Sequence, residues 1–390
     1  MGEVWPATNQ VPSPRCRLRR RLLLVMLLGM VLFGSGLGVS VAGVLRAPGT
    51  DSVAARLAEW GRDHGMDWLI NWLEKQQYER HRPPTGGVPV GGIPRTGAVS
   101  ATSADPHLTT GSSHLPVPPM LPPPSGVAPL PGEGQWETVV TVHGQPAVRV
   151  AHVRPDREHT SFLVGVMWID PTLVRGQLHP GFQDPGGTWQ AATSLAPAEQ
   201  RTVVAAFNAG FRLNASHGGY YSEGRTVRPL VDGAASLVLR TDGTAVVGAW
   251  NREVAMDSDV ASVRQNLVPL IDNGQVNPTC QSGGTAQWGS TVGQVAFIHR
   301  SGFGVTAGGG EVYVGGPALS VCSLGQILQA SGVERGMELD INPTWVSGVY
   351  FHPAPDGPPQ AFQLFPGEKV PAEHYLSPSS RDWYAFSGRP

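Results

Sequence analysis

Short runs of apolar residues, some unbroken and some alternating with polar ones, fill the C-terminal part of the chain. Clusters of Gly, Pro, Asn and Asp separate the runs, which is the pattern of β-strands joined by turns. Asp242-Gly243, between two of the runs, is a hairpin signal. The predicted strands span residues 138–143, 147–153, 161–169, 203–207, 235–239, 245–250, 295–298 and 312–314.

Helical signals are fewer in this part of the chain. We expect one short helix over residues 196–202 and a longer one that begins at Ser323, where Ser323-Leu324-Gly325-Gln326 has the pattern of a capping box. Gly332 can end the longer helix. Residues 135–390 suffice for one large domain with its own core. The predicted fold class is α+β, a predominantly β single globular domain with a few packed helices.

An uncharged segment, residues 22–44, predicts one N-terminal transmembrane helix, because about 20 apolar residues cross the hydrocarbon core. Arginines crowd residues 15–21, whereas only Arg46 lies close behind the segment. Residues 1–21 should therefore form a cytoplasmic basic tail, and the C-terminal domain should be extracytoplasmic. This describes a single-pass protein of the cell membrane. A cleaved signal peptide is the alternative, since Ser40-Val41-Ala42 resembles a cleavage site.

Residues 50–81 predict a juxtamembrane amphipathic helix, which Thr50 or Asp51 can cap. Tryptophan favours the membrane interface, so this helix could lie on the outer membrane surface. Self-association and packing against the domain are the alternatives. The residues that recur at helical spacing are Val53, Leu57, Trp60, His64, Trp68 and Trp72.

Residues 82–134 are rich in Pro, Gly, Ser and Thr, and residues 116–131 are too dense in proline for a helix or a sheet. We interpret the segment as a linker. A flexible coil of this length spans about 40 Å and an extended polyproline helix about 160 Å, so the domain could stand away from the membrane.

Composition restricts the classes of function. The 390 residues include 50 Gly and 36 Pro, which argues against a coiled coil or a helix bundle. With 28 basic and 30 acidic residues the net charge is -2, so there is no basic excess for a nucleic-acid partner. The sequence contains no HExxH, no GxSxG and no phosphate loop ending in GK[ST]. We expect no cofactor and no bound metal.

Cys280 and Cys322 both lie in the part expected to face outward, where thiols oxidise, whereas Cys16 precedes the apolar segment. We predict a disulfide between Cys280 and Cys322. Two unpaired buried cysteines, or half of a metal site, are the alternatives. No CxxC and no Cys/His pair at ligand spacing accompanies them.

Residues 337–342 alternate apolar and polar side chains and predict a strand with Glu338, Asp340 and Asn342 on one face. Pro343 would stop this strand and place Asp340 and Asn342 near its carboxyl end, where functional sites are often built. A solvated strand face is the alternative, because charged residues usually face water.

Asn208 and Gly210 follow the apolar run 203–207. The amide of Asn208 can hold a sugar hydroxyl or a phosphoryl oxygen, or it can merely start a turn. The loop that continues to Tyr221 offers backbone and aromatic faces suited to a saccharide.

Arg300 ends another predicted strand, and Gly302 and Gly304 share its side by strand alternation. The Arg300 guanidinium can pair with a phosphate through two parallel hydrogen bonds, and the glycines leave room for the ligand. A surface arginine or an ion-pairing arginine is the alternative.

Taken in order, these segments resemble the phosphodiester glycosidase family over roughly residues 148–350. The family pattern has an apolar strand before Asn-Gly-Gly-Phe-Phe, a Gly/Asp-Gly stretch, Arg-x-x-x-Gly before a hairpin, and a helix before Asn-Leu-Asp-Gly-Gly-Gly-Ser. This chain departs from it after Asp340, where Ile341-Asn342-Pro343-Thr344 stands in place of the glycines. The corresponding segments are Phe207-Asn208-Ala209-Gly210-Phe211, Val231-Asp232-Gly233, Arg300-Ser301-Gly302-Phe303-Gly304 and Glu338-Leu339-Asp340.

The resemblance implies hydrolysis of the bond between the anomeric carbon of a sugar and a phosphodiester oxygen. Such a reaction needs an anion clamp, a carboxylate and polar groups that orient the ring, roles that Arg300, Asp340 and Asn208 can fill. Glu338 is a possible second carboxylate. The expected substrate-binding residues are Gly210, Gly302, Tyr221 and Asn342.

The partner implied by this chemistry is a phosphorylated glycan or another envelope polymer. The first alternative is a catalytically degenerate envelope module that binds phosphorylated glycan or a protein partner, which the missing glycines after Asp340 favour. A purely structural anchored protein is the second.

Overall fold

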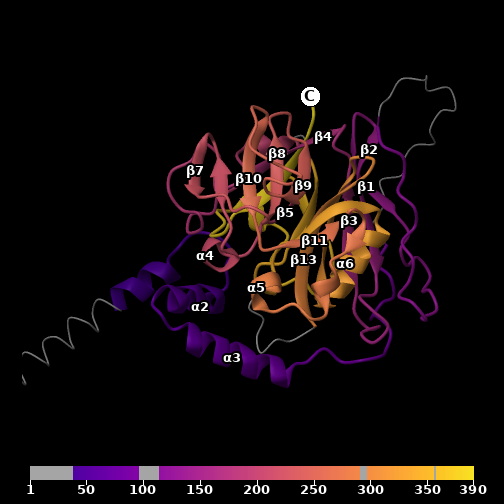
Figure 1. Ribbon diagram of the computed structural model, residues 1–390, viewed down its shortest axis with the longest axis horizontal. Coiled ribbons are helices and arrows are strands. Elements are labelled where there is room, and N and C mark those ends of the chain that lie inside the picture. The colour runs from indigo at the N-terminus through magenta and orange to yellow at the C-terminus, as the bar shows by residue number, and fades with distance from the viewer. Residues whose placement is uncertain (1–37, 96–113, 290–296, 355–356) are drawn as a thin grey trace, which may run out of the picture. The chain divides into compact units, whose positions relative to one another are not determined.

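The computed structural model describes residues 38–95, 114–289, 297–354 and 357–390 (Figure 1). The expected basic tail and most of the expected transmembrane segment lie outside these residues. In the part that is described, none of the helices combines the length and the apolar character that crossing a membrane requires. The chain divides into two compact units, one made of the residues up to Ala47 together with Ser52–Asp67, the other of Pro48–Asp51 and Trp68–Pro390.

Two helices replace the single helix expected over residues 50–81. They are α2, Val53–Asp63, and α3, Asp67–Arg80. The N-cap of α2 is Ser52, whose hydroxyl accepts a hydrogen bond from the Ala55 N–H, and not Thr50 or Asp51. The helices are separate because Gly65 takes a left-handed conformation with φ of 75° between them.

The described part of the expected linker packs on the globular domain. Leu121 is 1 % exposed within a hydrophobic cluster, and its N–H donates to the Gly134 carbonyl. The Arg154 guanidinium lies 2.7 Å from the Glu133 carboxylate and also donates to the Ala128 carbonyl. Proline fixes φ, so a proline-rich strap loses little conformational freedom when it docks. The interpretation of these residues as a free linker is therefore wrong, and the domain begins upstream of residue 135.

The domain contains three sheets, in which all pairings between the named strands of the described residues are antiparallel. The largest sheet is eight-stranded. Its strands, in spatial order, are β1 (Glu137–Val142), β2 (Gln145–Val153), β3 (Val164–Ile169), β14 (Glu311–Leu319), β13 (Ile298–Thr306), β15 (Val333–Glu338), β11 (Pro269–Asp272) and β12 (Gln275–Val276).

The other two sheets have five strands each. One contains β7 (Arg225–Arg228), β6 (Tyr220–Ser222), β10 (Val260–Gln265), β8 (Ala235–Arg240) and β9 (Ala245–Ala249). The other contains β17 (Gln360–Gln363), β16 (Gly348–His352), β5 (Val203–Asn208), β18 (Trp383–Gly388) and β4 (Val174–His179). The domain is thus mostly β, as predicted.

Helices in the domain are few and short. The residues expected to form a helix at 196–202 make only the 3-10 turn η1 (Glu199–Arg201). The remaining helical segments among the described residues of the domain are α4 (Leu213–Ser216), η2 (Pro278–Cys280), α5 (Thr285–Trp288), α6 (Val321–Ala330) and η4 (His374–Leu376).

The start predicted for α6 is wrong by two residues. Its N-cap is Ser320, whose hydroxyl accepts from the Ser323 N–H at 3.0 Å, because Ser323 is the third helical residue and not the cap. Gly332 follows the helix with φ of 81°. The predicted disulfide is confirmed: Cys280 of η2 and Cys322 of α6 are bonded, with their Cα atoms 5.0 Å apart.

Phe207 of β5 stands where two of the sheets face each other. Its ring lies 5.3 Å from that of Phe303 in β13, 4.6 Å from that of Tyr313 in β14 and 5.4 Å from that of Phe386 in β18. All six residues of β5 are buried. This packing brings the carboxyl end of β5 next to β13 and to the residues that follow β15.

Candidate functional site

A pocket lies at the carboxyl end of β5. Because β16 and β18 run antiparallel to β5, the residues before these strands meet its last residue, and the Asn208 N–H donates to the Ser347 carbonyl. The space between its lining residues that no atom fills is about 280 Å³, a figure that includes open solvent. Its polar and aromatic lining consists of Asn208, Asp340, Thr344, Ser347, His374, Ser379, Arg381, Asp382, Trp345, Tyr375 and Trp383, and Gly210 also lines it.

A β-bulge places Asp340 in this pocket. β15 ends at Glu338, and Ser301 of β13 then exchanges backbone hydrogen bonds with two residues, accepting from the Leu339 N–H and donating to the Asp340 carbonyl, both at 2.8 Å. Two residues opposite one re-aim the side chains that follow. The regular strand predicted over residues 337–342 is therefore wrong beyond Glu338, and Glu338 and Asp340 have different surroundings.

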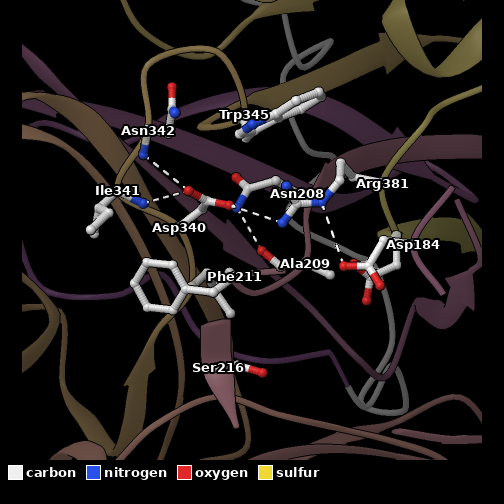
Figure 2. A network of polar contacts seen from close by, with 12 residues as sticks. Asp184, Asn208, Ala209, Phe211, Ser216, Asp340, Ile341, Asn342, Trp345 and Arg381 are labelled. Atoms are coloured by element: carbon white, nitrogen blue, oxygen red, sulfur yellow. Dashed lines mark hydrogen bonds and ion pairs between the residues drawn. The ribbon is translucent and has the colours of Figure 1, made fainter. Parts of the chain in front are cut away.

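The Asp340 carboxylate is held from two sides (Figure 2). Its Oδ1 accepts from the N–H groups of Ile341 and Asn342, at 2.7 and 3.0 Å, and its Oδ2 lies 3.8 Å from Nη2 of Arg381. The Asn342 side chain instead accepts from the Thr344 N–H and does not line the pocket. Asn342, predicted to bind substrate, thus positions Asp340 through its backbone.

Asn208 lines the pocket with every hydrogen-bonding group of its amide already used. Its Oδ1 accepts from the Tyr313 hydroxyl and from the Ser347 N–H, and its Nδ2 donates to the Ala209 carbonyl and to the Ser301 hydroxyl at 3.0 Å. This network ties β5 to β13, to β14 and to the residue before β16. Asn208 is therefore built to position its neighbours.

Arg300 and Glu338 form a buried ion pair away from the pocket. Nη1 of Arg300 lies 2.5 Å from the Glu338 carboxylate, each side chain is 2 % exposed, and Nε of Arg300 donates to the Leu319 carbonyl. Burial raises the pKa of Glu338, and the Arg300 charge opposes that shift. Neither residue lines the pocket, so the ion-pairing alternative describes Arg300 in this structure, and a phosphate clamp at that position does not fit.

Two other predicted binding residues also lie outside the pocket. Gly302 faces α6, where a Cβ would meet the Leu328 side chain at 3.1 Å and the Met337 carbonyl at 3.0 Å, so the helix fills the room that we expected for a ligand. Tyr221 of β6 packs against the hydrophobic cluster of Val238 and Trp250. The local alternation of the sequence does not reveal which face a helix will cover.

Arg381, which the sequence analysis did not single out, is the arginine of the pocket. Besides its approach to Asp340, its Nε lies 3.8 Å from the Asp184 carboxylate, and its guanidinium carbon lies 5.1 Å from the centre of the Trp345 ring. Arg381 is 6 % exposed. Arg381 lies outside residues 148–350, the part that resembles the family. The sequence feature that could have identified it is the charged pair Arg381-Asp382, which directly precedes the apolar run of β18.

The other ionisable groups of the pocket are engaged or neutral. Asp382 pairs with Arg264 at 2.6 Å, with side chains 0 % and 1 % exposed; burial raises the pKa of Asp382 and the Arg264 charge opposes this. Burial lowers the pKa of His374, with Asp51 opposing, so this imidazole is neutral near pH 7. Burial also raises the pKa of the Tyr375 hydroxyl, which lies 2.5 Å from the Ser347 hydroxyl. Asp340 and Arg381 are the ion pair of which both members line the pocket.

No protein-family model and no curated protein sequence matches this chain. Among solved structures, the chain is similar to the catalytic domain of zebrafish N-acetylglucosamine-1-phosphodiester alpha-N-acetylglucosaminidase, described as auto-inhibited by a pro-peptide. The identity is 14 %, the match covers 66 % of this chain and 88 % of that one, and the TM-score is 0.43.

Two further solved structures are similar to the chain. A protein from Synechocystis has 14 % identity, with 65 % of this chain and 64 % of that one covered and a TM-score of 0.38. A Burkholderia pseudomallei protein named as exported has 12 % identity, 59 % and 74 % coverage and a TM-score of 0.31. At these identities and TM-scores the likeness concerns the course of the chain alone.

Proposed function

We propose that the domain is a hydrolase that cleaves the glycosidic bond of a sugar 1-phosphodiester, with a phosphorylated cell-envelope glycan or glycoconjugate as substrate and the outer side of the cell membrane as its location. The observation that carries the proposal is the meeting of Asn208 and Asp340 in one pocket. They come from two separate segments of the family pattern, and Arg381 lies beside them, 3.8 Å from Asp340.

In this proposal Asp340 is the catalytic carboxylate. It either stabilises the positive charge that develops on the sugar or activates the attacking water. The bulge after β15 and the two N–H groups on Oδ1 fix its direction, which leaves Oδ2 toward Arg381. Cleavage of this bond releases the sugar and a phosphate monoester, which leaves readily, so the reaction has little need of a general acid.

Arg381 takes the role of anion clamp that the sequence analysis gave to Arg300. A guanidinium binds two phosphate oxygens at once, and the face of Trp345 restricts its orientation. Trp345 adds aromatic surface on which a sugar ring can lie.

Binding without turnover is the second candidate, and one observation favours it. Both oxygens of Asp340 and the whole amide of Asn208 already have partners within the protein. A pocket with its polar groups so occupied can recognise a phosphorylated glycan through Arg381 and its aromatic walls without cleaving it.

Asp340→Asn in the full chain separates the two candidates. Release of sugar from synthetic phosphodiesters of different sugars is measured, and we expect the variant to lose at least about 100-fold in rate, or roughly 2.7 kcal/mol of transition-state stabilisation, with an unchanged melting temperature. The matched control is Asp259→Asn at an exposed carboxylate that does not line the pocket. An active Asp340→Asn variant refutes the mechanism, whereas binding by the wild type without any turnover decides for the second candidate.

A further inference from the structure

The helix α3 carries an exposed aromatic surface. Trp68 is 72 % exposed, Trp72 55 % and Leu73 49 %, and none of the residues of α3 is buried. Residues four apart lie on the same side of a helix, so Trp68 and Trp72 form one face, with Leu73 at its edge. Most of the apolar surface of these three side chains is therefore left uncovered by the described residues.

The position of α3 in the chain indicates what covers this face. The uncharged segment that predicts a membrane span ends at Val44, and α2, about 17 Å long at about 1.5 Å per residue, is the only named helix of the described residues between Val44 and α3. After α3, the Gly86 N–H donates to the Glu158 carbonyl at 2.6 Å, which attaches the chain to the globular domain. The helix therefore connects the predicted span to the domain.

The chemistry of α3 suits the neutral part of the membrane interface. Indole rings prefer the headgroup level, where the ring is apolar and its N–H stays hydrated. The charged side chains of the helix carry one more acidic than basic group, so anionic lipid is not what attracts it. These charged residues are Asp67, Glu74, Lys75, Glu79 and Arg80.

We propose that α3 lies on the outer membrane surface, with Trp68, Trp72 and Leu73 inserted at the headgroup level. The helix then holds the domain beside the lipid. This inference is independent of the proposed hydrolase activity, because it rests on the exposed face of α3 and on the segment before it.

Depth-dependent quenching of tryptophan tests the proposal. The full chain is reconstituted into phosphatidylcholine vesicles whose acyl chains carry bromine either near the headgroup or near the bilayer centre, and flotation establishes that it is bound. We expect Trp68→Phe/Trp72→Phe to lose at least half of the quenching by shallow bromine that the wild type shows. Trp136→Phe, a control at a partly buried ring that donates to the Pro119 carbonyl, keeps that quenching.

Three results would overturn the proposal. Equal quenching of the double variant and the wild type places α3 away from the lipid. A full chain that does not float with the vesicles removes the membrane attachment itself. A photoreactive group at position 73 that crosslinks to a second copy of the chain, and not to lipid, identifies self-association as the use of this face.

Discussion

Glu311→Gln should make the stability of the domain less dependent on pH, because Glu311 is a buried carboxylate that makes no ion pair with any of the residues described by the structure. It starts β14 and is 1 % exposed. Its Oε1 accepts from the Ala245 N–H of β9 at 2.7 Å, whereas its Oε2 has no hydrogen-bond partner among the described residues. Burial raises the pKa of Glu311 from its ordinary value of 4.5 to about 8, with the Ala245 N–H opposing that shift.

The sign of the effect follows from proton binding. Between pH 4.5 and pH 8 the folded state keeps a proton on Glu311 that the unfolded state has lost, so the free energy of unfolding falls as the pH rises. One pKa unit corresponds to about 1.4 kcal/mol, so the wild type loses on the order of 3 kcal/mol through this group between about pH 5 and pH 8. Glutamine keeps the oxygen that accepts from the Ala245 N–H and cannot ionise. The free energy of unfolding of the variant therefore lacks this pH-dependent loss.

Urea unfolding of wild type and Glu311→Gln at a series of pH values measures the difference directly. The gap in unfolding free energy between the two proteins should widen in favour of the variant as the pH rises, while other titrating groups cancel. Glu334→Gln, at an exposed carboxylate, is the matched control and should follow the wild type. Parallel curves for wild type and Glu311→Gln would refute the reasoning.

Two further predictions concern Arg381, which takes the proposed role of anion clamp, and Arg300, to which the sequence analysis gave that role. Arg381→Lys keeps the charge but loses bidentate binding, so KM for a sugar phosphodiester should rise at least about 10-fold with an unchanged melting temperature; an unchanged KM would exclude Arg381 as the anion clamp. Arg300→Met leaves Glu338 buried without its partner, so the free energy of unfolding should fall by about 3–5 kcal/mol while the protein that remains folded keeps its KM. Weakened substrate binding with unchanged stability would return the clamp role to Arg300.

The sequence predicted the strands well where the signal is local. The apolar runs that became β1, β2, β5 and β8 lie within two residues of the observed bounds, because alternation and turn residues act over a few positions. The disulfide was predicted because two cysteines share the part that we expect to be exported, and it is confirmed. The membrane span and the outward orientation stay predictions.

The errors of the sequence analysis share a physical origin, which is contact between distant segments. Leu121 packs in a hydrophobic cluster with residues of strands that come later in the chain. The composition around Leu121 does not reveal these contacts and therefore predicted a linker. The prediction continued the alternating strand through Asp340, but hydrogen bonds to Ser301 of β13 form a bulge at this position. The Arg300 guanidinium has the chemistry to bind a phosphate, but it forms an ion pair with the Glu338 carboxylate of β15. No sequence motif identifies Arg381, because its partners come from two distant parts of the chain, one with Asp184 and the other with Asp340 and Trp345.

The resemblance paired Asn208 with Asp340, and the hydrogen bonds give that pairing a physical reason. Nδ2 of Asn208 donates to the Ser301 hydroxyl, and the same hydroxyl accepts from the Asp340 N–H at 3.1 Å. Ser301 thus connects the end of β5 to the bulge that directs Asp340. Asn208 need not touch the substrate for its loss to disturb the carboxylate, which makes it a positioning residue.

A double-mutant cycle tests whether Asn208 acts through Asp340. Asn208→Ala leaves the Tyr313 hydroxyl and the Ser347 N–H without this acceptor, at a cost of about 1–3 kcal/mol for each buried group, and frees the bulge. If Asn208 serves only to position Asp340, then Asn208→Ala/Asp340→Asn should hydrolyse the phosphodiester no more slowly than Asp340→Asn alone. Additive losses in rate would show that Asn208 contacts the substrate itself. In a protein that binds without turnover, the same cycle read in glycan affinity makes the same distinction.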